Sequence, residues 1–344
     1  MSSKFIQALK YLFFLTVGCV IFYFIYKDED LGKIKEAFLN AKYIWIVLSL
    51  FAGLLSHISR TFRWKQVLGE MDYKVRTATC FHSVMIGYMV NLIIPRGGEV
   101  SRCVALAQVE KIPFLKLMGT VVAERLIDLV MMIVILFIAL ALNFGRIMQL
   151  INDNASLQHI TNSILNNKIF IILFFLLIVM GFVFRKQILG KVVLDKIRMA
   201  TKSFIEGFSA IGKLKNKWVF VAHSVFIWTM YYLMTYLVFF AFDFTANLSA
   251  NSALVVFILG SLGVLFPSPG GIGTWHYMVI LSLSIYGIGN IEASTFALVL
   301  HTTQNFMLLT VGLISLSVLY TRFNLKSLNL KTDNKKSGGD AILD

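Results

Sequence analysis

Long runs of apolar residues alternate with short polar segments along this chain. A helix needs about 20 apolar residues to cross the roughly 30 Å hydrocarbon core of a bilayer. Runs that reach or approach this length occur at residues 6–26, 43–62, 117–142, 168–185, 218–242 and 293–320. The pattern predicts an all-α polytopic membrane protein with about six transmembrane helices in a single domain, residues 1–325.

Two further apolar runs, at 78–94 and 252–266, are shorter, and each ends at a cluster of Pro and Gly. The loops around each run are expected on one side of the membrane, so each run would enter and leave by the same face. We therefore expect two re-entrant helical hairpins that enter from opposite faces. Irregular backbone at membrane depth is tolerated only where protein or a water-filled cavity surrounds it, so these hairpins indicate a functional interior.

Composition and charge narrow the class and set the expected orientation. Apolar residues make up 58% of the 344 residues and charged residues 15%, which excludes a disordered chain, a disulfide scaffold and an ordinary soluble enzyme. The net charge is +14, and Lys and Arg collect in the loops at 59–77 and 186–217 and in the tail after 321. Basic loops stay cytoplasmic. We expect both termini in the cytoplasm of a bacterial inner membrane, and anionic lipid rather than nucleic acid as the partner.

Two polar or basic segments and the cysteines carry smaller predictions. The basic loop predicts an interfacial helix at 192–211, with a solvated linker helix as the alternative. The polar residues 326–344 predict a disordered cytoplasmic tail. The cysteines are scattered without metal or redox spacing and are expected as buried thiols; they are Cys19, Cys80 and Cys103.

The two hairpin tips share an order of residues. Both run from a glycine, Gly87 or Gly260, through an apolar stretch into proline and then paired glycines. The tip residues are Pro95, Gly97 and Gly98 in the first hairpin and Pro267, Pro269, Gly270, Gly271 and Gly273 in the second. Opposite insertion with a similar order indicates an inverted repeat, which in secondary transporters places broken helices around a midplane site.

Three charged residues, Glu124, Arg125 and Asp128, interrupt the apolar run 117–142. A charge at the bilayer centre costs about 2.5–3.5 kcal/mol on insertion scales. Glu124 and Asp128 share a helix face, whereas Arg125 points elsewhere and could reach Glu99. We interpret the group as a charged cavity for a polar headgroup, with structural ion pairs near the cytoplasmic end as the alternative.

A second charged group, Arg96, Glu99 and Arg102, surrounds the first tip at spacings of three. These residues share one face if the chain becomes helical after Gly98. Arg96 and Arg102 could then hold a lipid phosphate by bidentate hydrogen bonds at a helix start. The alternative is a tight turn with an arginine reaching toward water. Asn91 either caps the broken helix or lines the cavity.

The second tip has no charge and predicts a close-packed bend of unwound backbone. His276, His301 and Gln304 are secondary candidates for contact with a headgroup, with simple packing as the alternative. No phosphate-binding loop, zinc spacing or nucleophile motif occurs in the sequence. We therefore expect no enzymatic activity, no cofactor and no metal.

The run from Gly87 to Arg102, the Glu124-Arg125-Leu-Ile-Asp128 motif and the Pro269-Gly270-Gly271-Ile-Gly273 motif together resemble one family. It is the transmembrane flippase-like region of bacterial lysylphosphatidylglycerol synthases, which also occurs as stand-alone membrane proteins. The resemblance covers about residues 5–320 and implies a lipid-translocating fold with two opposed re-entrant hairpins. The soluble aminoacyl-transfer domain is absent from this sequence, so lysyltransferase activity is not expected. Many members carry Glu where this chain has His276.

Two functional hypotheses follow. In the first, the chain is a lipid flippase or transporter for a phospholipid or other polar-headgroup lipid. Its lipid-binding residues would be Asn91, Arg96, Glu99, Arg102, Glu124, Arg125 and Asp128. In the second, it is a non-transporting membrane partner that presents lipid to a separate glycosyl- or aminoacyl-transferase. A homo-oligomer is compatible with both.

Overall fold

The computed structural model describes residues 31–153, 205–266 and 268–337, together with Thr16, Val20, Tyr23, Lys27 and Lys202. Every regular element in these residues is helical. The elements are α2 (Leu31–Leu39), α3 (Tyr43–Gly69), α4 (Thr77–Ile93), α5 (Gly97–Glu110), α6 (Phe114–Asp153), α10 (Lys217–Phe239), α11 (Asp243–Ala246), α12 (Ala250–Gly263), the 3₁₀ turn η2 (Pro269–Gly271), α13 (Thr274–Ser284) and α14 (Asn290–Ser337). The all-α class is confirmed. The expected spans 6–26 and 168–185, most of the basic loop, Cys19 and Pro267 lie outside the described residues.

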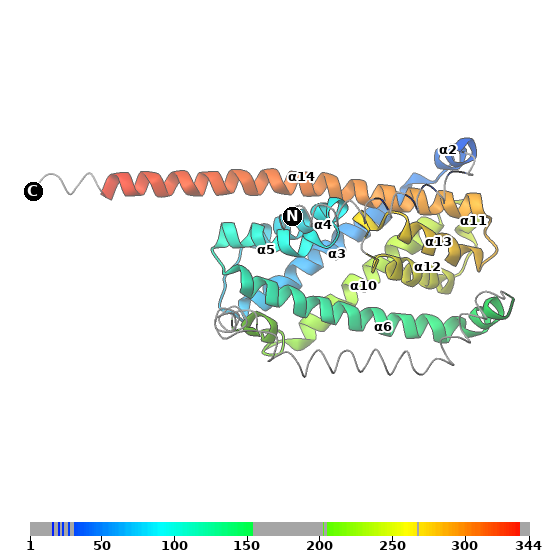
Figure 1. Ribbon diagram of the computed structural model, residues 1–344, viewed down its shortest axis with the longest axis horizontal. Coiled ribbons are helices and arrows are strands. Elements are labelled where there is room, and N and C mark those ends of the chain that lie inside the picture. The colour runs from blue at the N-terminus through cyan, green and yellow to red at the C-terminus, as the bar shows by residue number, and fades with distance from the viewer. Residues whose placement is uncertain are drawn as a thin grey trace, which may run out of the picture.

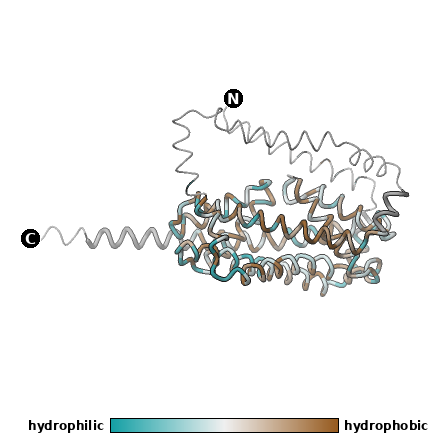
Figure 2. The backbone as a smooth tube through the Cα atoms, turned by 90° about the horizontal axis from the view of Figure 1, so that it is seen from below, coloured by the Kyte–Doolittle hydropathy of each residue, from teal (hydrophilic) through white to brown (hydrophobic). Residues whose placement is uncertain are grey.

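Four of the described helices are long and apolar enough to cross a membrane. They are Tyr43–Gly69, Phe114–Gly145, Lys217–Phe239 and Asn290–Thr321. These helices confirm four of the runs predicted from hydropathy, and the chain is a multi-pass membrane protein. Figure 2 shows apolar positions along the middle of the bundle and hydrophilic positions mostly toward its ends, as a bilayer-spanning bundle requires.

The two shorter apolar helices each turn back as a helical hairpin. α4 packs on α5 across the connection 94–96, and α12 packs on α13 across a connection that contains η2. Glycine permits both close approaches: a Cβ on Gly98 would collide with the carbonyl oxygen of Gly87, and one on Gly263 would lie 2.8 Å from the carbonyl oxygen of Thr274. Small residues let helix backbones approach in a membrane without a large apolar contact.

The helices form a bundle, and two of its apolar cores have the most buried residues. α3 and α10 pack along each other and run obliquely between α14 and α6, which lie at opposite edges of the view in Figure 1. One core lies among α3 to α6 around Trp64 and Leu106. The other lies among α10, α12, α13 and α14 around Phe239 and Phe296. Each hairpin therefore has its own core. Cys80 and Cys103 are buried in the first core, as expected.

Two helix boundaries differ from the prediction. The basic segment 59–77 was expected as a cytoplasmic loop, and this is wrong for 59–69, because α3 continues to Gly69. The charged residues end the apolar run, but a helix can continue through charged residues, and residues 59–69 contain no Pro that would break it. Residues 326–344 were expected to be disordered, whereas α14 continues to Ser337. Leu and Lys are good helix formers, and a formed helix propagates more easily than a new one begins. Within the predicted interfacial helix 192–211, the described residues 205–209 are helical.

Candidate functional site

The tips of the two hairpins meet. Arg96 lies between α4 and α5 in the left-handed region, at φ 59°, and its Nη2 donates to the carbonyl oxygen of Leu265, 2.9 Å away. Leu265 follows α12 in the second hairpin. η2 packs against α4 close to Leu92. Segments about 170 residues apart thus share one contact region, and the hydrogen bond between them is exposed.

The start of α5 is closed by side-chain and turn hydrogen bonds. α5 begins at Gly97, so the paired glycines belong to the helix instead of preceding it, and the amide of Gly98 donates to Oδ1 of Asn91 at 2.7 Å. The amide of Gly97 donates to the carbonyl oxygen of Ile94 at 2.9 Å. Asn91 therefore caps the broken helix. The amides of Gly97 and Gly98 therefore already have partners and are not free to bind an anion.

The second tip is unwound backbone braced by histidine. Gly270, Gly271 and Gly273 all have positive φ, from 57° to 83°, which glycine adopts without steric cost. His301 Nε2 lies within hydrogen-bond distance, 2.8 Å, of the carbonyl oxygen of Gly270. The His301 ring also contacts the buried His276, at 4.3 Å between centroids. These histidines hold the bend in place, and the third secondary candidate, Gln304, is half-buried nearby on α14.

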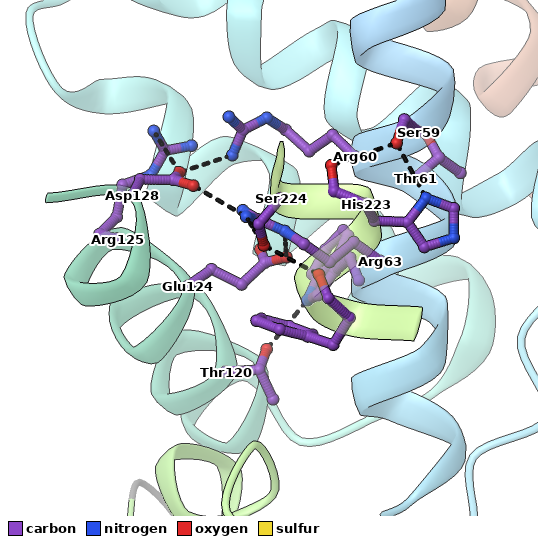
Figure 3. A network of polar contacts seen from close by, with 12 residues as sticks. Ser59, Arg60, Thr61, Arg63, Thr120, Glu124, Arg125, Asp128, His223 and Ser224 are labelled. Carbon is purple, nitrogen blue, oxygen red and sulfur yellow. Dashed lines mark hydrogen bonds and ion pairs between the residues drawn. The ribbon is translucent and has the colours of Figure 1, made fainter. Parts of the chain in front are cut away.

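A network of buried charges lies beside the first hairpin (Figure 3). Glu124 on α6 is fully buried and is shared by two arginines. Its Oε1 accepts from Arg63 Nε of α3 at 3.3 Å, and its Oε2 accepts from Arg102 Nη2 of α5 at 3.0 Å. Glu124 therefore connects α3, α5 and α6 at one point.

Asp128, one helical turn further along α6, is shared by three arginines. Its Oδ2 accepts from Arg60 Nη1 at 2.8 Å, and its Oδ1 lies 2.9 Å from Arg63 Nη1. Arg125 Nη1 lies 3.5 Å from the same carboxylate. Arg125 also reaches across to α5, where its Nε lies 3.5 Å from Glu99 Oε1. The predicted approach of Arg125 to Glu99 is thus present in the structure.

Aromatic and hydroxyl groups orient the guanidinium groups. Arg102 lies over the ring of Trp64, 4.7 Å from its centroid, in a cation–π contact. Arg63 donates to Ser224 Oγ of α10 at 3.0 Å. Arg60 donates to the hydroxyl of Tyr231 at 3.3 Å, which in turn lies 3.0 Å from the hydroxyl of Tyr88. α4 and α10 therefore complete the shell around the charges.

A small cavity adjoins this network between α4 and α5, and Arg125 of α6 closes one side of it. Its polar lining comes from Asn91, Glu99, Arg102 and Arg125, and its volume of about 10 Å³ has room for about one water molecule. Within the described part of the chain, Arg102 Nε and Nη1 and Glu99 Oε2 make no hydrogen bond. The residues that the structure describes contain no group of three or more His, Cys, Asp or Glu side chains that could hold a metal ion.

Comparison with known proteins identifies the family. Residues 8–312 match the family described as the lysylphosphatidylglycerol synthase TM region. The chain belongs to this family. It is also similar to a UPF0104 membrane protein of Methanocaldococcus jannaschii, with 24% identity over 94% of this chain and 97% of that protein. No solved structure matches the chain.

Of the predicted lipid-binding residues in the lysylphosphatidylglycerol synthase TM motifs, all except Arg96 lie in or beside the charge network. Five of the predicted lipid-binding residues form the network, namely Glu99, Arg102, Glu124, Arg125 and Asp128. Asn91 lines the adjoining cavity. Arg96 instead contacts the second hairpin. The expected pairing of Arg96 with Arg102 on one phosphate is therefore absent from this conformation.

Sequence reasoning missed the α3 half of the network. Arg60 and Arg63 were assigned to a cytoplasmic loop, yet both are buried and hold Asp128 and Glu124. The available signal was helical spacing: Ser56, Arg60, Arg63 and Val67 recur at intervals of three or four and all are buried on one face. Tyr88 and Tyr231 gave no comparable signal, because aromatic residues are frequent throughout this chain.

The network lies inside the bundle, below a basic rim. Glu124 is ten residues from the start of α6, about 15 Å along the helix axis. Around the same helix ends, Lys65 donates to Thr77 at 2.7 Å and Lys116 pairs with Glu206 at 2.7 Å. The hydrogen bond from Lys116 lowers the pKa of the Glu206 carboxyl. Lys65 and Lys116 thus lie at the end of the bundle where α3 ends and α6 begins, which is the end nearer to the buried charges.

Proposed function

We propose that this chain moves a phospholipid or another polar-headgroup lipid across the cytoplasmic membrane, without a catalytic step of its own. The observation that carries the proposal is the buried charge network beside the meeting point of two helical hairpins. Membership of a family named for a lipid synthase supports a lipid as the substrate. Charges inside the membrane mark pathways for polar substrates more often than they stabilise a fold.

The faces of α6 favour a lipid over a soluble substrate. Leu126, Val130 and Phe137 are exposed on the outer surface of α6, Phe137 to 67%. On the inward face of the same helix, Glu124 and Asp128 are buried in the network. One helix therefore presents an apolar side for acyl chains next to a charged interior for a headgroup, as a lipid-moving protein requires.

In this proposal the hairpins are re-entrant and belong to an inverted repeat. α4–α5 would insert from the cytoplasmic face and α12–α13 from the outer face. Their tips share the hydrogen bond from Arg96 to Leu265. Transport would proceed by rocking of one repeat against the other, which breaks this contact and opens the network to one side at a time.

The proposal includes an orientation, with both termini cytoplasmic. In a variant without native cysteines, Lys74→Cys lies in the loop before α4 and Asn247→Cys lies just after α11. A membrane-impermeant thiol reagent added to intact cells should label Asn247→Cys and leave Lys74→Cys unlabelled until the membrane is opened. Labelling of Lys74→Cys in intact cells would reverse the orientation.

Transport is tested with purified protein in liposomes that contain fluorescent phospholipid, with a quencher added outside. Wild type should move lipid between leaflets faster than empty liposomes. Arg96→Ala and Glu124→Gln should slow the movement, because they remove the contact between tips and the centre of the network. Lys42→Gln is the matched control, since Lys42 forms an exposed ion pair with Asp243.

Wild-type rates in both variants would refute the residue assignment. Absence of movement by the wild-type protein, together with co-purification of a glycosyl- or aminoacyl-transferase, would replace transport with the second hypothesis. In that case the chain presents lipid to a separate enzyme.

A further inference from the structure

The buried network carries an excess of positive charge. Four arginines, at 60, 63, 102 and 125, face three carboxylates, at 99, 124 and 128. Among the described residues, no other carboxylate lies within ion-pair distance of these arginines. A buried charge without a partner is costly, often by several kcal/mol. One further negative charge would balance the network.

The unsatisfied atoms identify where that charge would sit. Arg60 and Arg63 direct most of their guanidinium nitrogens to Asp128, Glu124, Ser224 and Tyr231. Arg60 Nε and Arg63 Nη2 make no hydrogen bond among the described residues, but neither arginine lines the cavity. Arg102 is only 3% exposed and gives one nitrogen, Nη2, to Glu124. Its Nη1 and Nε make no hydrogen bond within the described chain, and the residue lines the cavity formed by α4, α5 and Arg125 of α6. A guanidinium N–H without another partner can donate a charge-assisted hydrogen bond to a phosphate oxygen.

We infer that this cavity is the binding site for one singly charged phosphate group, held by Arg102 and Arg125. The group is either the phosphodiester of a lipid headgroup or a free phosphate ion. The lipid form of the inference rests on the function proposed above. Its donors are side chains, and the amides of Gly97 and Gly98 are already bonded to Ile94 and Asn91.

Charge balance makes the site selective for net charge. A phosphodiester with one negative charge, such as phosphatidylglycerol, neutralises the excess of one. A zwitterionic headgroup such as phosphatidylethanolamine adds no net charge, so one arginine stays unbalanced. A phosphate-free lipid such as diacylglycerol leaves both donors of Arg102 empty. We expect the affinity to fall in that order.

We expect a phosphate group to enter the cavity past the ion pair between Glu99 and Arg125. The cavity has room for about one water molecule, so a phosphate enters only if the helices that line it, α4, α5 and α6, separate locally. The Glu99–Arg125 contact is long, at 3.5 Å, and is exposed to 25% and 39% at its two side chains. The Arg102–Glu124 pair behind it is buried. Opening the outer pair exposes Arg102 and releases Arg125 to share the phosphate.

Two charge variants with opposite expected effects test the site in detergent-solubilised protein. Binding of short-chain phosphatidylglycerol, phosphatidylethanolamine, diacylglycerol and inorganic phosphate is measured by native mass spectrometry. Arg102→Gln removes the excess charge and should weaken phosphatidylglycerol binding roughly ten- to hundredfold, the loss of one charge-assisted hydrogen bond. Glu99→Gln raises the excess and releases Arg125, so it should strengthen the same binding by about tenfold.

The matched control is again Lys42→Gln, which should bind as wild type. Because Glu99→Gln predicts a gain, a folding defect in Arg102→Gln cannot imitate the whole pattern. Competition by inorganic phosphate without a preference among lipids would assign the site to free phosphate. Preference for phosphatidylglycerol would assign it to the headgroup. Equal binding of diacylglycerol, or unchanged binding in both variants, would overturn the inference.

The binding and transport assays separate the two proposals. Charge-selective binding without lipid movement in liposomes would refute transport and leave the anion site standing. Lipid movement that does not depend on Arg102, Glu99 or headgroup charge would refute the anion site and leave transport standing.

Discussion

Removing the carboxylate of Glu124 should be one of the most damaging single changes in this protein. Its side chain is fully buried and accepts hydrogen bonds from Arg63 and Arg102. Glu124→Gln keeps the shape and leaves both arginines without their shared counter-charge. Breaking a buried ion pair by removing one partner costs about 3–5 kcal/mol. That is a large part of the roughly 5–15 kcal/mol by which a typical protein is stable.

The comparison variant is Lys42→Ala, which breaks the exposed pair with Asp243. Exposed pairs contribute about 0–1 kcal/mol, so this variant should unfold close to wild type. Both are measured by denaturant unfolding in detergent micelles, followed by tryptophan fluorescence. Trp64 lies beneath Arg102 and reports on the region directly.

A double variant is a stricter test of whether the charges stabilise the protein as a network. Glu124→Gln with Arg102→Gln removes one charge of each sign and restores the original excess of one. Arg63 then keeps its contacts with Asp128 and Ser224. The double variant should be more stable than the sum of the two single losses, by about 0.5–3 kcal/mol. Strict additivity, or a Glu124→Gln loss no larger than that of Lys42→Ala, would refute the network as the stabilising element.

Two further predictions concern the first hairpin. Gly98→Ala places a methyl group against the carbonyl oxygen of Gly87, so the hairpin should open and thermal stability should fall. Gly145→Ala meets nothing within 4 Å and should be neutral in the same melt, so equal losses would contradict the close crossing. Exchanging the charges of Glu99 and Arg125 tests their pairing. Either single reversal should destabilise the protein, and the double exchange should recover part of the loss; no recovery in a double-mutant cycle would exclude the pair.

The sequence anticipated the hairpins for a clear physical reason. The apolar runs 78–94 and 252–266 end in Pro and Gly and are too short to cross a bilayer, and their length is a local property of the sequence. Asn91 was likewise recognisable as a cap or cavity residue, because an amide in an apolar run needs a nearby partner. The partner it found, the amide of Gly98, is seven residues away.

Hydropathy misplaced Arg60 and Arg63, because a charge count treats every arginine as a loop residue. Their partners, Asp128 and Glu124, lie more than 60 residues away on α6. For Arg96, the sequence motif predicted the wrong partner. Arg96 lies in the same motif as Arg102, but its backbone is in the left-handed region and its side chain contacts Leu265 on the other hairpin.

The sequence alone determined the membrane class, the four described spans, the two hairpins and the presence of charges where charges are costly. Each of these depends on residue type and spacing within a short stretch, so local patterns suffice. The tertiary structure decided which charges share a partner, that arginines exceed carboxylates within the network, and that the free donors of Arg102 face a cavity. Ion pairing depends on distances between helices, and those distances are fixed only when the glycine crossings and the apolar cores bring the helices together.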